Sequence, residues 1–141
     1  MTRDDTWSAE ITLEVPFHDI DMMGVVWHGH YAKYFEYART ALLERIDFGY
    51  EAMKTSGYAW PVIDMHVRYA QPIQYGQRIR VKARLTEYET RLRVDYVIRD
   101  ADTGRRLTRG HTMQVALDMA EGEMCLVSPD IVFDKLGVDK P

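Results

Sequence analysis

Residues 30–48 form one long helical pattern in a chain whose other patterned segments alternate with the two-residue period of strands. Apolar residues recur in this segment at spacings of three and four, which is typical of a helix with one apolar side. They are Tyr31, Tyr34, Phe35, Ala38, Leu42 and Ile46. Gly49 is a natural end for this helix. A single long helix can cover only one sheet, and this limits the folds open to the chain.

Two-residue alternation predicts a strand at 10–17, before the helix, and several strands after it. The later strands are expected at 62–69, 78–86, 91–99 and 106–118, with a short one at 124–127. Short turns separate them, which favours antiparallel neighbours. We therefore expect an α+β fold in which a curved antiparallel sheet wraps around a long central helix. A single domain is expected over 1–141, with its core at about 10–127.

Composition narrows the class of protein. Hydrophobic residues make up 46% and charged residues 28% of the 141, which is the profile of a globular rather than a disordered chain. The formal net charge of −4 argues against nucleic acid as a partner, because domains that bind it are usually basic. The single cysteine, Cys125, closes no disulfide within the chain. Without a signal-peptide pattern or an apolar run of about 20 residues, we expect a cytoplasmic protein with no membrane span.

The segment 18–29, between the first strand and the helix, holds the candidate chemistry. Asp19 and Asp21 lie two residues apart in it, close to Gly24 and Gly29. The helix that follows has no Ser, Thr or Asp cap, so its first N–H groups are open to another acceptor. Such a helix start stabilises a developing oxyanion. A neighbouring Asp that attacks a carbonyl carbon or activates water completes the minimum needed to hydrolyse a thioester.

Histidines and arginines give two further signals. His28 and His30 flank Gly29 but have no third ligand at a suitable spacing, so neither a metal nor another cofactor is predicted. Basic residues line the outer face of two successive strands. They are Arg78, Arg80, Lys82 and Arg84, then Arg91, Arg93 and Arg99. Most side chains of this kind simply face solvent, but arginine is well suited to holding phosphate groups.

The loop and the helix after it resemble the 4-hydroxybenzoyl-CoA thioesterase family, and within it the acyl-CoA thioesterase branch. The residues that carry the resemblance are Asp19, Asp21, Gly24, Val25, Val26, Trp27, His28 and Tyr31, followed by Phe35, Glu36, Ala38 and Arg39. Tyr69, Pro72 and Gly76 extend it, and the likeness covers about 11–117. It implies a hotdog fold and a homo-oligomer, either a dimer or a tetramer, with active sites between subunits.

The resemblance also implies roles for particular residues. Asp21 would be the catalytic carboxylate, and the backbone N–H of His28 would polarise the thioester carbonyl. The substrate would be an acyl-CoA, or an acyl group on a carrier protein, hydrolysed to the free acid. Residues expected to meet the substrate are Gly24, Val26, Trp27 and Tyr31, with Arg91 and Arg93 at the phosphates. Trp60 and Met65 are further candidates for the pocket wall.

Two alternatives remain open at the level of the sequence. A hydratase or dehydratase acting on acyl thioesters would use a carboxylate–histidine pair, which Asp21 and His28 would imitate. A non-catalytic module that binds acyl thioesters would keep the fold but has no need of a carboxylate at position 21.

Overall fold

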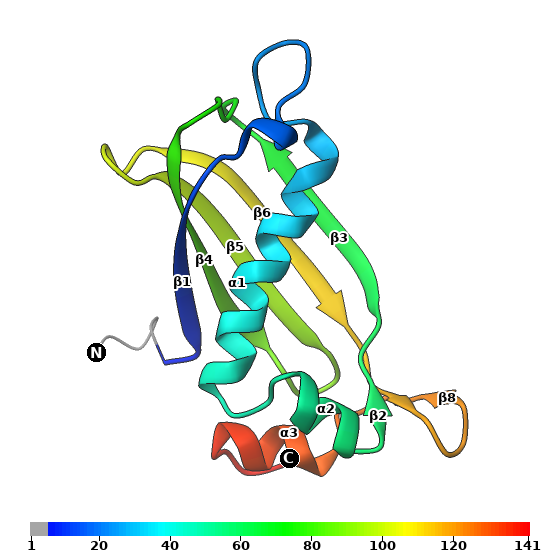
Figure 1. Cartoon of the computed structure of the whole chain (residues 1–141). Helices are drawn as coiled ribbons and strands as arrows, with labels where there is room; N and C mark the ends of the chain where they lie inside the picture. The colour runs from blue at the N-terminus through cyan, green and yellow to red at the C-terminus, as the bar shows by residue number, and fades with distance from the viewer. Residues whose placement is uncertain (1–5) are drawn as a thin grey trace.

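The computed structural model describes residues 6–141. A five-stranded antiparallel sheet, in the order β1-β4-β5-β6-β3, curves around the helix α1 (Figure 1). α1 spans Tyr31–Arg45. The strands are β1 (Ser8–Glu14), β3 (Val62–Tyr69), β4 (Arg78–Glu87), β5 (Leu92–Asp100) and β6 (Arg106–Gln114). The α+β architecture and the wrapped central helix predicted from the sequence are confirmed.

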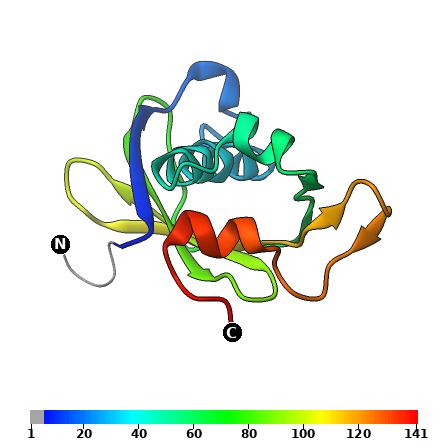
Figure 2. The same ribbon diagram turned by 90° about the horizontal axis from the view of Figure 1, so that it is seen from below.

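Short elements complete the fold. The 3-10 turns η2 (Phe17–Asp19) and η3 (His28–His30) flank the loop before α1. A second, three-stranded sheet contains β2 (Tyr58–Ala59), β7 (Leu117–Asp118) and β8 (Glu123–Met124). The sequence patterns did not predict α2 (Tyr50–Thr55) or α3 (Asp130–Leu136), which lie at the same end of the molecule (Figures 1 and 2). None of the helices within residues 6–141 has the length and apolarity needed to cross a membrane.

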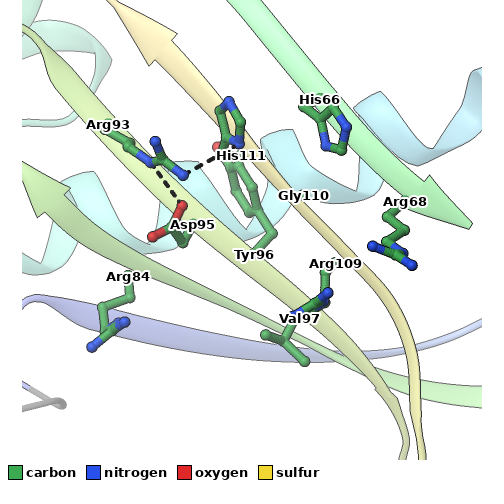
Figure 3. A pocket seen from close by; sticks show the side chains of 10 residues that line it. All are labelled: His66, Arg68, Arg84, Arg93, Asp95, Tyr96, Val97, Arg109, Gly110 and His111. Carbon is green, nitrogen blue, oxygen red and sulfur yellow. Dashed lines mark hydrogen bonds and ion pairs between the residues drawn. The ribbon is translucent and has the colours of Figure 1, made fainter. Parts of the chain in front are cut away.

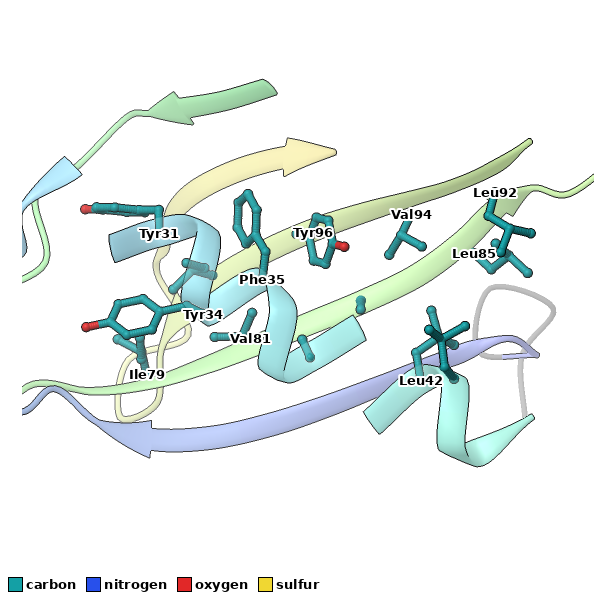
Figure 4. Close-up of a cluster of buried hydrophobic side chains, with 14 of the residues drawn as sticks. Tyr31, Tyr34, Phe35, Leu42, Ile79, Val81, Leu85, Leu92, Val94 and Tyr96 are labelled. Atoms are coloured by element: carbon teal, nitrogen blue, oxygen red, sulfur yellow. The ribbon is translucent and has the colours of Figure 1, made fainter. Parts of the chain in front are cut away.

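The core lies between α1 and the inner face of the main sheet. Along β5, Leu92, Val94, Tyr96 and Ile98 are buried while the residues between them are partly exposed, as two-residue alternation requires. Figure 4 shows Tyr31, Tyr34, Phe35 and Leu42 of α1 facing these strands. Through Val132, Phe133 and Leu136, α3 adds buried side chains beyond residue 127, where the core was expected to end.

Gly110 on β6 allows α1 to approach the sheet closely. The ring of Phe35 stacks on Tyr96, with centroids 4.3 Å apart and planes inclined by 4°. A Cβ atom at position 110 would overlap both the Phe35 ring and the backbone carbonyl of His66. The missing side chain of Gly110 therefore leaves room for the stacked pair at the centre of the core.

β3 forms one edge of the main sheet and is largely exposed along its length. Its exposed residues include Val62, Ile63, Met65 and Tyr69, which are apolar or aromatic. An exposed apolar edge strand is a ready template for pairing with another chain. The exposed edge of β3 therefore has both the backbone groups and the apolar side chains that strand pairing uses.

The close packing at Gly110 yields a stability prediction. Gly110→Ala is expected to lower the free energy of unfolding by about 2–3 kcal/mol, the upper part of the range for overpacked cores, because one clash is with backbone. Urea denaturation measures the loss. Combining Gly110→Ala with Phe35→Leu should cost less than the sum of the two single changes, since the smaller side chain relieves one clash. Strict additivity would contradict the packing described here.

Candidate active site

Asp19, the first carboxylate of the loop, is buried and ties the loop to α1. Lys33 Nζ donates to its Oδ1, and the Tyr34 hydroxyl donates to its Oδ2, both at 2.6 Å. Burial alone would raise the pKa of Asp19, but these hydrogen bonds and the charge of Lys33 outweigh it and hold the pKa below its ordinary value. Burial and the neighbouring Asp19 in turn raise the pKa of Tyr34. Asp19 is therefore a charged structural anchor.

Asp21 begins a tight turn that its own side chain helps to close. Its Oδ1 accepts a hydrogen bond from the Met23 N–H at 2.8 Å, and its carbonyl accepts one from the Gly24 N–H at 3.0 Å. Gly24 has a φ of +81°, a left-handed conformation that glycine adopts without strain. Within the described residues the Asp21 carboxylate makes only this one hydrogen bond, so its second oxygen is left to a ligand.

The turn is held on a rigid base. Ile20, before the turn, forms an antiparallel bridge with Val26, after the turn. Val25 forms a second bridge with Gln74, in the connection between β3 and β4. The buried Val26 also donates its N–H to the Ile73 carbonyl at 2.7 Å. Met22 and Met23 lie at the tip of the turn and are 99% and 80% exposed.

The start of the helical segment follows directly. The Trp27 N–H donates to the Asp19 carbonyl at 3.0 Å, which binds the end of the loop to its beginning. Among residues 6–141, the backbone N–H groups of His28 and Gly29 donate to no backbone acceptor outside η3. These residues begin η3, and the first N–H groups of a helix have no acceptor within the helix. The Tyr69 hydroxyl donates to the His28 carbonyl at 2.8 Å and fixes this turn from β3. Two N–H groups are thus open at the end of the molecule that holds Asp21.

The remaining residues expected to meet the substrate differ in their surroundings. Gly24 is exposed at the turn, and Trp27 is about half exposed, with its indole lying over Gly29. Val26, Tyr31 and Trp60 are buried, so within one chain they belong to the core. Tyr31 makes an edge-to-face contact with Tyr69, at 4.7 Å between centroids. Met65 is exposed on the β3 edge.

Arg91 does not lie near Asp21 within one chain. The first residue of β4 pairs with Glu14, just before the loop, whereas Arg91 follows the last residue of β4. The 10 residues of β4 span about 30 Å, so Arg91 lies at the opposite end of the sheet. Arg91 Nε donates to Glu87 at 2.9 Å. Arg93 lies on the outer face of the sheet, where its Nε donates to Asp95 at 3.0 Å.

The structure also identifies site residues that the sequence patterns did not. Lys33, Tyr34 and Tyr69 position the loop and the helix start, although none was assigned such a role. The sequence held one signal for Lys33 and Tyr34: a carboxylate that is buried needs hydrogen-bond donors, and the helix after the loop offers them. Among the described residues, no three His, Cys, Asp or Glu side chains are grouped as metal ligands would be.

A carboxylate with a free oxygen, in a loop that leads into an uncapped helix start on a helix wrapped by an antiparallel sheet, has the groups that acyl transfer requires. Comparison with protein families agrees with this chemistry: the model of the thioesterase-like superfamily matches residues 15–132. This protein belongs to the thioesterase-like superfamily.

Two sequence relatives support the assignment. A Synechocystis protein whose name assigns it provisionally to the esterases is 32% identical over 128 residues, or 90% of this chain and 77% of its own length. The acyl-CoA thioester hydrolase YbgC of Escherichia coli is 30% identical over 74 residues. That match spans about half of each protein, at 52% of this chain and 55% of YbgC.

Solved structures support the fold. The DHNA-CoA thioesterase of Staphylococcus aureus superposes with a TM-score of 0.77 and 28% identity, over 84% of this chain and 80% of its own. A 1,4-dihydroxy-2-naphthoyl-CoA thioesterase of Synechocystis gives a TM-score of 0.81 over 92% of this chain and 96% of its own. Its identity is 20%, so it bears on the fold alone. The predicted hotdog fold is confirmed.

The buried Asp19 yields a pH-dependent stability prediction. Because its folded-state pKa is lowered, its stabilising contribution is present above the ordinary aspartate value of about 3.9 and is lost as the pH falls through the lower folded value. Asp19→Asn is expected to cost about 1.5–3 kcal/mol at pH 7, the range for hydrogen bonds to a charged group. Urea denaturation of both proteins should show the difference shrinking below pH 4. A constant difference across that range would contradict a charged Asp19.

Proposed function

We propose that this protein hydrolyses acyl-CoA thioesters to a free acid and CoA, with Asp21 as its catalytic carboxylate. One observation carries the proposal: a carboxylate with a free oxygen is held in a backbone-paired turn that leads directly into a helix start with open N–H groups. Membership of the thioesterase-like superfamily gives the class of reaction. The activity named for YbgC supports acyl-CoA as the substrate.

Two chemical routes use these groups. As a nucleophile, an Asp21 oxygen attacks the thioester carbon, the CoA thiolate leaves, and water then hydrolyses the mixed anhydride. As a general base, Asp21 takes a proton from a water molecule that attacks the same carbon. Both routes place negative charge on the carbonyl oxygen. The backbone N–H of His28 donates a hydrogen bond to that oxygen and stabilises its charge. In other enzymes, loss of one such donor costs about 3–4 kcal/mol of transition-state stabilisation.

The hydratase alternative finds less support in the geometry. It needs a carboxylate–histidine pair, yet the only hydrogen bond that the Asp21 carboxylate makes to the described residues comes from the Met23 N–H. The His28 ring instead packs near Trp27 and Tyr69, with centroids 5.0 and 6.5 Å away. Asp21 is thus oriented by its own turn, as suits attack on a carbonyl group or activation of water.

We further propose that the protein is a homodimer formed through the β3 edges. Antiparallel pairing of two β3 strands inverts one subunit relative to the other. The partner subunit's Arg91 then lies at the same end of the molecule as Asp21, which one chain alone does not achieve. The exposed apolar residues of β3 support this contact. A tetramer of such dimers, an acyl-carrier-protein substrate and a cytoplasmic location stay predictions.

The catalytic proposal is tested by Asp21→Asn. Release of free thiol from short, medium, long and aromatic acyl-CoAs should fall at least about a hundredfold, the lower end for a positioned acid–base group, with folding unchanged. Asp118→Asn is the matched control, since the Asp118 carboxylate accepts a backbone N–H two residues on, from Ala120 at 2.9 Å, as Asp21 does. The control should keep full activity. An unchanged rate in Asp21→Asn would refute the assignment.

The dimer proposal is tested by Met65→Lys on the exposed β3 edge. A charge placed at an apolar contact is expected to weaken dimerisation by at least about tenfold, equivalent to 1.4 kcal/mol, and to lower thioester hydrolysis in parallel. Size-exclusion chromatography with light scattering reports the assembly. Met119→Lys, on an exposed residue outside the main sheet, should leave both unchanged. Dimerisation as strong as in the wild type would place the interface elsewhere.

A further inference from the structure

The outer face of the main sheet carries basic side chains in cross-strand register. Cross-strand partners on β4, β5, β6 and β3 form two neighbouring rows on this face. The first row is Arg84, Asp95, His111 and His66, and the second is Lys82, Val97, Arg109 and Arg68. The chain as a whole has a net charge of −4, so this basic face is a local feature rather than a consequence of composition.

All residues of these rows except Lys82 line a hollow of about 400 Å³ (Figure 3). Val97 contributes a short side chain to the second row, whereas its neighbours in that row are long and basic. Figure 3 shows Arg68, Arg109 and Arg84 around it, with His66 and His111 on one side. The volume is within the range of sites for small molecules, about 300–1,000 Å³.

Cationic side chains face one another across strands in this hollow. Arg68 is the direct cross-strand neighbour of Arg109, an arrangement of like charges that destabilises a sheet. Within residues 6–141, neither guanidinium has a hydrogen bond or an ion pair. Two arginines without partners, held side by side, are what an anion-binding site requires before its ligand arrives.

The acidic residue of the hollow is already compensated. Arg93 Nε donates to Asp95 Oδ1 at 3.0 Å, and Arg93 Nη2 lies 3.4 Å from His111 Nδ1. A histidine that accepts at Nδ1 carries its proton on Nε2, so His111 presents a donor. The rings of His66 and His111 stack at 5.5 Å between centroids. The open side of the hollow is therefore lined mainly by hydrogen-bond donors.

We propose that this hollow, on the face of the sheet opposite α1, binds the diphosphate group of a small molecule. Each guanidinium matches two phosphate oxygens in a fork, so the Arg68–Arg109 pair suits two linked phosphates. The imidazoles add donors beside them. Nucleoside diphosphates and triphosphates contain linked phosphates, as does CoA itself, and any of them would satisfy this chemistry.

The charges also argue against a second copy of the chain as the occupant. Two of these faces packed back to back would bring Arg68 and Arg109 of each copy close to the same cations of the other. Such a contact juxtaposes like charges and would need an anion between the copies. A small anion in the hollow neutralises the same residues without that cost.

Calorimetry tests the site by measuring the binding of inorganic pyrophosphate, ADP and CoA to the chain of 141 residues. Saturable binding is expected for wild type, weakened at least about tenfold in the double variant Arg68→Gln with Arg109→Gln. Both side chains are exposed, so the fold should survive, which circular dichroism checks. The double variant Lys54→Gln with Arg105→Gln removes the same charge from exposed positions outside the hollow and should bind as wild type does.

Three results would overturn the proposal. The first is no saturable binding of pyrophosphate or ADP at millimolar concentration, and the second is equal weakening of binding in both double variants. The third is binding of polyglutamate alone, which would indicate an acidic protein partner.

Two results would support the proposal and identify the source of the diphosphate. A raised KM for acyl-CoA with unchanged kcat in the Arg68/Arg109 variant indicates the substrate's own diphosphate. Loss of ADP binding with unchanged KM indicates a free nucleotide. The calorimetry does not depend on the proposed hydrolase activity, so the two proposals fail separately.

Discussion

The buried carboxylate of Asp19 is the contact on which the site depends. It accepts hydrogen bonds from Lys33 and Tyr34, one turn into α1, while its backbone carbonyl receives the N–H of Trp27. A single residue thus joins the entry of the loop, the exit of the loop and the helix. A buried charge of this kind is tolerated only when it is paired and hydrogen-bonded. Because Asp19 is held in this way, Asp21 and the uncapped helix start keep a fixed relation without any direct bond between them.

The two faces of the main sheet differ: one packs against α1, and the other carries basic side chains. Inward side chains such as Val94, Tyr96 and Ile98 pack against α1, and Gly110 lets Phe35 stack closely on Tyr96. Outward side chains of the same strands carry the basic rows and the hollow. Strand alternation makes the two faces independent, since consecutive residues point to opposite sides. The outer face could therefore acquire ligand-binding residues without disturbing the core.

The edge of the sheet links the fold to the site. A single chain leaves β3 unpaired on one side and leaves Arg91 about 30 Å from the loop that holds Asp21. A dimer through β3 would pair this edge. It would also bring Arg91 of the partner subunit to the end that holds Asp21, because inversion of the partner exchanges the two ends of the sheet. The hydroxyl of Tyr69 on this same strand supports the helix start through the carbonyl of His28. In the proposed dimer, assembly and the candidate site would therefore both depend on β3.

The sequence by itself determined the main strands and the long helix, because periodicity records which side of each element is buried. Asp21 was chosen as the candidate carboxylate from the resemblance to a thioesterase family, not from periodicity. Sequence patterns did not indicate α2 and α3, since helices of 6 and 7 residues form only where tertiary packing holds them. Only the tertiary structure decided that Asp19 is an anchor while Asp21 keeps a free oxygen, since the difference lies in Lys33 and Tyr34 reaching one carboxylate and not the other. Likewise, only strand register placed Arg68 beside Arg109 and set Arg91 apart from Asp21, because cross-strand neighbours are chosen by pairing and not by distance along the chain.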